Sequence, residues 1–230
     1  MSMDTVSYWN KTAQKEHYPR LDKSLETDIL IIGGGITGIT CAYCLALKGA
    51  EPILIEAGEL CDGTTGNTTG KITIQHNIIY SKIADKYGMN FAKLYAESQA
   101  GALDFVKEQV KQGEFDCQLA ENTAYVFASS EDDQDVVRHE YEVAKELKID
   151  AEYIERSEFP PDNFGMLGFK HQAVFHPVRY AEALAKEAVL KGAKIYCNTK
   201  AIKVEDGDIK KVYCENDVVI KAKHVVMATQ

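Results

Sequence analysis

The hydrophobic pattern of the chain changes several times between unbroken apolar runs and helical periodicity. Short apolar runs of four to six residues occur at 28–32, 52–55, 194–197 and 224–229. Runs of this kind are typical of parallel strands that are buried on both faces. The segment 37–48 lies between the first two runs, reads as a helix and ends at Gly49. This order predicts a βαβ unit with a right-handed crossover.

The pattern after residue 200 is different. Three short segments, 201–205, 209–214 and 218–221, are separated by Asp-Gly-Asp and Glu-Asn-Asp. Such tripeptides form hairpin turns, so the segments predict a β-meander placed before the last apolar strand. Together with the βαβ unit, this predicts an α/β fold with a central parallel sheet, helices and a meander.

Between these regions the chain is mostly helical. Helices are predicted over 80–112, with a break near 88–90, over 131–147 and over 178–191, and short strands over 117–119 and 123–128. Ser130 and Asp133 have the spacing of a capping box at the start of the second of these helices. The acidic residues 131–135 suit a helix N-terminus, where the dipole favours negative charge, and metal binding is the alternative.

Charge and composition exclude several classes of function. The chain has 230 residues, 45% of them hydrophobic, and a formal net charge of −9. An acidic chain is a poor ligand for nucleic acid or anionic lipid. The N-terminal residues lack the pattern of a signal peptide, and no apolar run is long enough to cross a membrane. We therefore expect a cytoplasmic protein without a nucleic-acid or membrane partner.

The six cysteines favour free thiols over disulfides, since the chain is long and has no signal peptide. Cys41 and Cys44 form a CxxC motif, for which redox or metal chemistry is one reading. The other reading is two ordinary thiols inside a helix, past the first turn. No second CxxC or CxxH completes a zinc or iron–sulfur set, so we predict no metal site.

The strongest chemical signal is the sequence GGGITG at 33–38. Gly33, Gly35 and Gly38 form G-x-G-x-x-G between a predicted strand and a predicted helix, and Glu56 ends the next strand. In this context the first glycine permits a tight turn, the second allows close approach of a pyrophosphate, and the third allows close helix packing. The acid can bind a ribose diol and would repel a 2′-phosphate, which disfavours NADP. The motif predicts a dinucleotide site.

Three segments together resemble the D-amino-acid-oxidase-like FAD oxidoreductases. They are SYW at 7–9, the run from 28 to 58, and GTTGNTTGKITIQH at 63–76. The third segment is most similar to a bacterial branch whose members often carry a C-terminal Rieske domain. The resemblance implies a Rossmann-like FAD-binding fold with part of an inserted α+β substrate domain. It places the FAD-binding domain at 1–109 and 173–230, discontinuous and truncated, and the substrate domain at 110–172.

The resemblance also implies site residues. The implied cofactor-binding residues are Gly33, Gly35, Ile36, Thr37, Gly38, Glu56, Ala57, Gly63, Thr64, Thr65, Asn67, Thr68, Thr69 and Ala201. Lys71 and His76, with Gln75 between them, lie where the loop would approach the flavin ring and are candidate catalytic residues. For His76, as for His176, an ordinary hydrogen-bonding role is the alternative.

The implied activity is FAD-dependent oxidation of a C–N bond in an amine or amino acid, with hydride transfer to flavin N5. Lys71 would then stabilise the reduced flavin. Two alternatives stay open. The chain could be a truncated nucleotide-binding module without turnover, or an electron-transfer flavoprotein partnered with a Rieske iron–sulfur domain. The family's later strands and its last flavin-binding segment are absent here, which puts FAD binding by this stretch alone in question.

Overall fold

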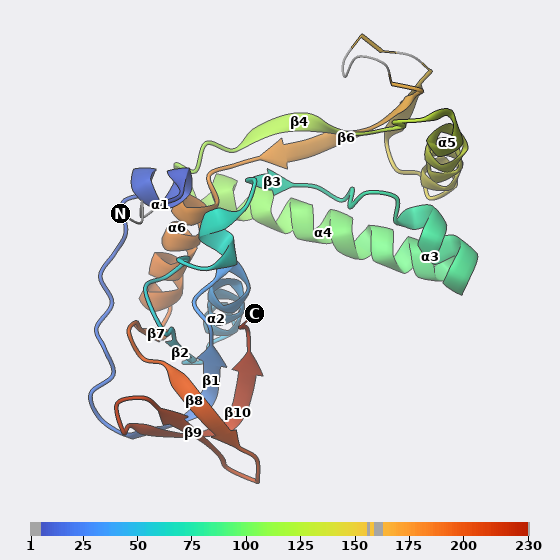
Figure 1. Ribbon diagram of the computed structural model, residues 1–230. Coiled ribbons are helices and arrows are strands. Elements are labelled where there is room, and N and C mark those ends of the chain that lie inside the picture. Colours follow the sequence, from blue (N-terminus) through green and yellow to red (C-terminus); the bar gives the residue numbers. More distant parts are fainter. Residues whose placement is uncertain (1–5, 156, 159–162, 230) are drawn as a thin grey trace, which may run out of the picture. The chain divides into compact units, whose positions relative to one another are not determined.

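The computed structural model describes residues 6–155, 157–158 and 163–229 (Figure 1). The chain forms two compact units. The first unit comprises 1–69, 115–117 and 176–230, and the second comprises 70–114 and 118–175. The boundaries differ from the expected ones, because residues 70–109 belong to the second unit. Their helices pack on that unit's core through Tyr80, Ala96 and Leu103.

A six-stranded sheet organises the first unit, in the order β7-β2-β1-β10-β9-β8. The four strands β1, β2, β7 and β10 are parallel, and β8 and β9 are antiparallel neighbours at one edge. Their bounds are β1 Leu25–Ile32, β2 Ile53–Ile55, β7 Lys194–Tyr196, β8 Ala201–Glu205, β9 Lys210–Cys214 and β10 Val219–Met227. The unit also contains α1 Tyr8–Thr12, α2 Ile36–Leu47, the 3₁₀ turn η1 Thr64–Asn67 and α6 Pro177–Leu190.

Both faces of β2 and of the last three residues of β1 are buried, as their unbroken apolar runs predict, whereas β10, predicted to be buried as well, has exposed residues such as Met227. On one face Leu30 and Ile32 pack beside Ile53 and Ile55. Ile31, which alternates with the first pair along β1, is fully buried as well. Helices α2 and α6 pack against each other beside the sheet (Figure 1). The predicted parallel sheet is therefore present.

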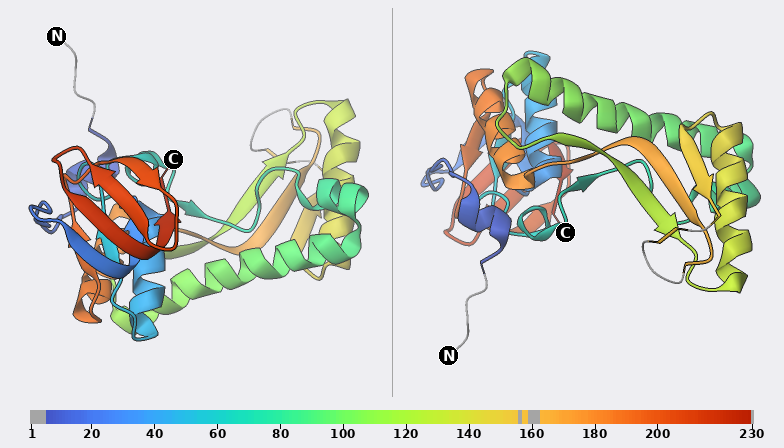
Figure 2. Two further views of the ribbon diagram at one scale, coloured as in Figure 1. Left: turned by 90° about the horizontal axis from the view of Figure 1, so that it is seen from below. Right: turned by 90° about the horizontal axis from the view of Figure 1, so that it is seen from above.

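The meander differs from the prediction in one respect. The predicted third segment and the predicted last strand are one continuous strand, β10 (Figure 2). Its first residues pair antiparallel with β9, and the whole strand pairs parallel with β1. No glycine, proline, asparagine or aspartate separates the two segments, so nothing in the sequence 221–224 turns the chain.

The second unit is built on an antiparallel sheet with the order β3-β6-β4, in which β5 also pairs with β6. The strands are β3 Lys71–Ile72, β4 Ala120–Phe127, β5 Ala151–Ile154 and β6 Met166–Val174, and the helices are α3 Tyr80–Tyr87, α4 Met89–Gly113 and α5 Glu131–Glu146. The strand predicted over 123–128 is present as part of β4, which begins earlier, at Ala120, whereas the strand predicted over 117–119 is wrong. Gln118 adopts a left-handed conformation, so only one strand forms, after it.

Two caps fix the helices of this unit. The hydroxyl of Ser130 accepts a hydrogen bond from the N–H of Asp133, which confirms the predicted start of α5. Glu140, a fully buried residue of α5, accepts hydrogen bonds from the N–H groups of Ile79, Tyr80 and Ser81 at 2.6–2.9 Å. A carboxylate in this position compensates the unpaired donors at the start of α3.

Candidate functional site

A cavity of about 490 Å³ lies at the carboxyl ends of β1, β2 and β10. The chain leaves β1 towards β2 on one side, and β10 returns on the other side, so this edge is the topological switch point of the sheet. Ligands of open α/β sheets bind at such a point. The lining residues are Gly33, Gly35, Ile36, Thr37, Glu56, Cys61, Asp62, Gly63, Thr64, Thr65, Ala228 and Thr229.

The glycine turn has the geometry that the motif predicts. Gly33 has a φ of +115°, and a Cβ there would lie 2.6 Å from the carbonyl oxygen of Ala228. A Cβ on Gly38 would overlap the carbonyl oxygen of Gly33. The first glycine therefore makes the turn, and the third lets α2 pack against it.

The backbone donors of this turn fall into two groups. The N–H of Gly34 donates to Glu56 Oε2 at 2.5 Å, and that of Ile36 donates to Thr65 Oγ1 at 3.0 Å. The N–H groups of Gly35 and Thr37 have no hydrogen-bond partner within the described ranges. Both residues line the cavity at the N-terminus of α2, where free donors and the helix dipole attract an anion.

Glu56 sits beside these donors with its position fixed. Its carboxylate accepts from the N–H of Gly34 and, at 2.9 Å, from that of Gly58. Its own carbonyl accepts from the N–H of Thr199 at 2.8 Å. An ionised carboxylate has about four acceptor sites, so two remain for ligand hydroxyls. An anion-binding turn next to a carboxylate acceptor fits a diphosphate joined to a ribose, as in FAD.

The loop after β2 forms part of the side of the cavity that the glycine turn and Glu56 leave open. Cys61 lies in the left-handed region at a φ of +62°, and its N–H donates to the carbonyl of Gly34 at 3.0 Å. Burial raises the pKa of its thiol to about 12, so the sulfur is protonated and is not a nucleophile. The side chain of Asn67 donates to the carbonyl of Gly63 at 2.9 Å and so stabilises the loop itself.

The cofactor-binding residues predicted from the sequence fall into two groups, those that line the cavity and those that do not. Eight of them line the cavity: Gly33, Gly35, Ile36, Thr37, Glu56, Gly63, Thr64 and Thr65. The residues Gly38, Ala57, Asn67, Thr68, Thr69 and Ala201 lie outside its lining. Gly38 and Asn67 have the packing and loop roles given above, and Ala201 opens β8 opposite Cys214.

Four lining residues were missed: Cys61, Asp62, Ala228 and Thr229. The last two follow β10 as Gly33 follows β1, and parallel strands end at a common edge. The sequence therefore contained a signal for Ala228 and Thr229, because the last apolar run is predicted to be a parallel strand that ends at this edge. Cys61 and Asp62 carried no signal, since only the loop conformation brings them to the cavity.

The candidate catalytic residues belong to the second unit. Lys71 is exposed on β3, and exposed His76 lies with Nε2 3.1 Å from Gln99 Oε1. Gln75 is buried and donates to the carbonyl of Asn77. Their proposed roles at the flavin stay predictions. His176 has the ordinary role, because its Nδ1 accepts from the N–H of Arg179 and caps α6.

Cys41 and Cys44 are free thiols inside α2, and burial raises the pKa of both. The described part of the chain brings no group of three or more His, Cys, Asp or Glu side chains together as metal ligands. None of its helices combines the length and hydrophobicity that a bilayer crossing requires.

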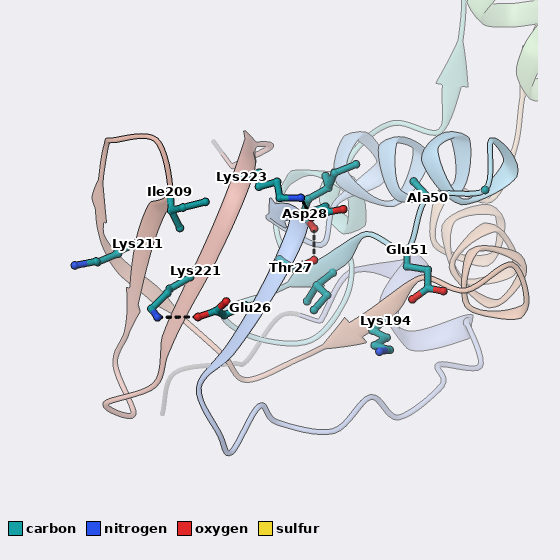
Figure 3. Close-up of a pocket in the computed structure, with 13 residues that line it drawn as sticks. Glu26, Thr27, Asp28, Ala50, Glu51, Lys194, Ile209, Lys211, Lys221 and Lys223 are labelled. Atoms are coloured by element: carbon teal, nitrogen blue, oxygen red, sulfur yellow. Dashed lines mark hydrogen bonds and ion pairs between the residues drawn. The ribbon is translucent and has the colours of Figure 1, made fainter.

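A larger cavity, of about 850 Å³, lies at the amino ends of the same parallel strands (Figure 3). Four of its seven charged residues form two ion pairs. Lys221 pairs with Glu26 and Lys223 pairs with Asp28, each at 2.7 Å. This cavity lies at the opposite end of the strands from the switch point, so its size gives no reason to assign it the chemistry.

Comparison with known proteins agrees with this geometry. The model of the DAO family, described as FAD dependent oxidoreductase, matches residues 28–230. The putative Rieske 2Fe-2S iron-sulfur protein YhfW of Bacillus subtilis is 36% identical over 96% of this chain and 43% of its own length. Gamma-glutamylputrescine oxidoreductase of Escherichia coli is 24% identical over 85% of this chain and 47% of its length. The chain thus spans less than half the length of these relatives.

Solved structures share the fold. Glycine oxidase from Geobacillus kaustophilus matches with a TM-score of 0.73 at 20% identity, over 89% of this chain and 55% of that one. L-proline dehydrogenase from P. horikoshii matches with a TM-score of 0.72 at 20% identity, over 91% and 54%. These likenesses confirm the predicted Rossmann-like fold. The chain belongs to the family of FAD-dependent oxidoreductases, the family that its glycine turn and its loop after β2 resemble.

Proposed function

We propose that this chain is the cofactor-binding part of a flavoenzyme that oxidises a C–N bond of an amine or amino acid. The observation that carries the proposal is the pair of unpartnered N–H groups, on Gly35 and Thr37, beside the Glu56 carboxylate in one cavity. A diphosphate needs such donors, and the ribose next to it needs such an acceptor.

In this proposal the chain's own groups divide the work of holding FAD. The amides of Gly35 and Thr37 bind the diphosphate, and Glu56 accepts from the ribose hydroxyls. Lys71 of β3 supplies positive charge to the reduced flavin. FAD, when bound, supplies the hydride acceptor, and the protein supplies orientation and electrostatics.

The substrate class rests on the relatives. Gamma-glutamylputrescine oxidoreductase, glycine oxidase and L-proline dehydrogenase are named for amines or amino acids. L-amino acid deaminase from Proteus vulgaris, at a TM-score of 0.71, is a further example. Other relatives are named for glycerol 3-phosphate, which makes a polyol phosphate the second choice.

The direct test is to titrate the purified 230-residue chain with FAD and follow flavin fluorescence and absorbance. We expect saturable binding, and we expect an amine substrate to bleach the bound flavin in the absence of oxygen. A chain that binds ADP but shows no affinity for FAD would instead be a nucleotide-binding module without turnover.

Glu56→Arg tests the ribose assignment. We expect the substitution to weaken FAD binding by at least roughly 100-fold, because it removes the acceptor and two loop hydrogen bonds, each charge-assisted. Glu51→Arg is the matched control. Glu51 is exposed at the larger cavity, and its substitution by arginine changes the net charge by the same amount. Equal affinity of the two variants would contradict the assignment.

An electron-transfer role is the second candidate. It is favoured by the 36% identity to a protein named for a Rieske cluster, of which this chain spans 43%. A flavoprotein of that kind would pass its electrons to an iron–sulfur domain outside this chain. It predicts reduction by a dye or NADH without peroxide release, whereas an oxidase releases peroxide when substrate and oxygen are present.

A further inference from the structure

An N-terminal arm, residues 6–24, runs along the first unit ahead of the region that the family model matches. The sequence predicts an irregular arm over residues 1–26, held to the rest of the chain by Trp9 and Tyr8. The arm contains one short helix, α1, which begins after Ser7, whose hydroxyl accepts from the N–H of Asn10. The extended chain that follows α1 leads into β1 (Figure 1).

The helix of the arm contacts the far end of the cavity loop, which we define as residues 60–68. The indole Nε1 of Trp9 donates to the carbonyl of Thr68 at 2.7 Å, which confirms the predicted anchor. The side chain of Asn10 lies against Gly66, so closely that a Cβ there would come within 2.5 Å of Asn10 Nδ2. This end of the loop is therefore held by α1.

Lys15 holds the near end of the same loop. Its Nζ donates to the carbonyl of Leu60 at 3.0 Å and to Asp62 Oδ1 at 2.5 Å. The lysine side chain is 23% exposed, and that of Asp62 is 51% exposed. Asp62 lines the cavity, so the arm reaches the wall of the proposed cofactor site without lining it.

The backbone on both sides of Lys15 is anchored to α6. The guanidinium of Arg179 donates to the carbonyl of Thr12 at 3.2 Å. The N–H of Glu16 donates to the buried carboxyl group of Glu182 at 3.2 Å. Lys15 therefore projects from a fixed segment, and its contacts with the loop cost less side-chain ordering than those of a lysine on a free chain.

The charge balance of the cavity gives Lys15 a second role. None of the residues that line the cavity within the described chain is basic, whereas Glu56 and Asp62 are acidic. An unpaired Asp62 carboxylate would repel a bound diphosphate. The ammonium group of Lys15 neutralises that carboxylate through the ion pair.

We propose that Lys15 is a positioning residue for the dinucleotide. It fixes the cavity loop through the Leu60 carbonyl and cancels the charge of Asp62, so that the wall accepts a diphosphate. The inference rests on the proposed function, FAD binding in this cavity. It extends the cofactor machinery to a segment outside the matched family region.

The test compares Lys15→Met with Lys11→Met in the full 230-residue chain. Lys11 lies on α1 of the same arm, and the two variants lose the same charge. We expect Lys15→Met to weaken FAD binding by roughly two- to fivefold at low salt, the range of a half-exposed charged pair, and Lys11→Met to leave it unchanged. Adding Asp62→Asn to Lys15→Met should recover part of the loss.

Hydrogen exchange without FAD measures the loop directly. Lys15→Met should speed exchange of the backbone amides at 61–68, and Lys11→Met should not. If the unmodified chain binds no FAD, the proposed function fails, and hydrogen exchange alone decides the role of Lys15. Equal FAD affinity of the two variants, or equal exchange where no FAD binds, would overturn the inference.

Discussion

Single residues without side chains decide the geometry of the cavity. Gly33 turns the chain out of β1 with a positive φ. The carbonyl oxygen of Gly33 occupies the space that a Cβ on residue 38 would fill. These two contacts bring the N-terminus of α2 to the edge of the sheet. The free donors of Gly35 and Thr37 lie at the cavity because this packing is so close.

We predict that Gly38→Ala destabilises the protein by about 1–3 kcal/mol, the usual cost of overpacking, because its methyl group would meet backbone atoms that cannot yield. Gly101→Ala is the control. Gly101 lies in the middle of α4 with nothing within 4 Å of a Cβ, so alanine should stabilise by up to about 1 kcal/mol. Urea unfolding followed by circular dichroism checks both variants. A stable Gly38→Ala variant would contradict the packing role.

At the scale of elements, buried polar side chains fix where helices begin. Glu140 caps α3 and His176 caps α6. Because His176 Nδ1 accepts from the N–H of Arg179, its proton is on Nε2, which lies 3.0 Å from Thr12 Oγ1 and donates to it. Burial, and then the positive charge of Arg179, lower the pKa of His176 below its usual 6.5.

This cap predicts a pH dependence. Above pH 6.5 the ring is neutral in both folded and unfolded chains, and the cap contributes fully. As the pH falls below 6.5, the unfolded chain takes up a proton that the folded one resists, so stability is lost down to the folded pKa. We expect His176→Asn, which keeps a good capping residue without titration, to lose less stability than the unmodified protein between about pH 7.5 and 5.

Urea unfolding at several pH values measures that difference. Comparing the two proteins is necessary because burial raises the pKa of nearby Glu182 to about 7. That group acts in the opposite direction, since the folded protein binds its proton more tightly and gains stability as the pH falls. Glu182 is present in both proteins, so its effect cancels. Parallel pH profiles would contradict the assigned role of His176.

At the scale of the whole molecule, the cavity lies entirely within the first unit. FAD should therefore stabilise that unit by linkage, by about 2.7 kcal/mol at a free concentration of 100 times its Kd. We expect a rise in Tm of about 5–10 °C for a chain of this length. Removing FAD by dialysis should reverse it. Thermal unfolding measured with FAD and, separately, with ADP checks this. A rise in Tm with ADP but not with FAD would contradict a dinucleotide site.

Much of the first unit was predictable from local patterns. The strand, the glycine turn and the helix over 28–47 follow from apolar runs and from residues whose backbone conformation is restricted in a known way. The cavity at their junction followed as well, because G-x-G-x-x-G has a physical meaning in that context. The caps of α5 and α6 lie within one turn of the helices they start, so they too are local features.

The remaining features depend on contacts between residues far apart in the sequence. β10 is one strand because its whole length pairs with β1, and Glu140 reaches α3 across about sixty positions. The unit boundary at residue 70 follows from how α4 packs on its core.

The sequence by itself determined the glycine turn, its carboxylate neighbour and hence the family, because these depend on backbone conformations that only certain residues allow. Only the tertiary structure decided that Asp62, Ala228 and Thr229 complete the cavity and that Lys15 pairs with Asp62 in its wall. Those residues have no local pattern, and they meet only because the sheet and the arm bring distant segments to one edge.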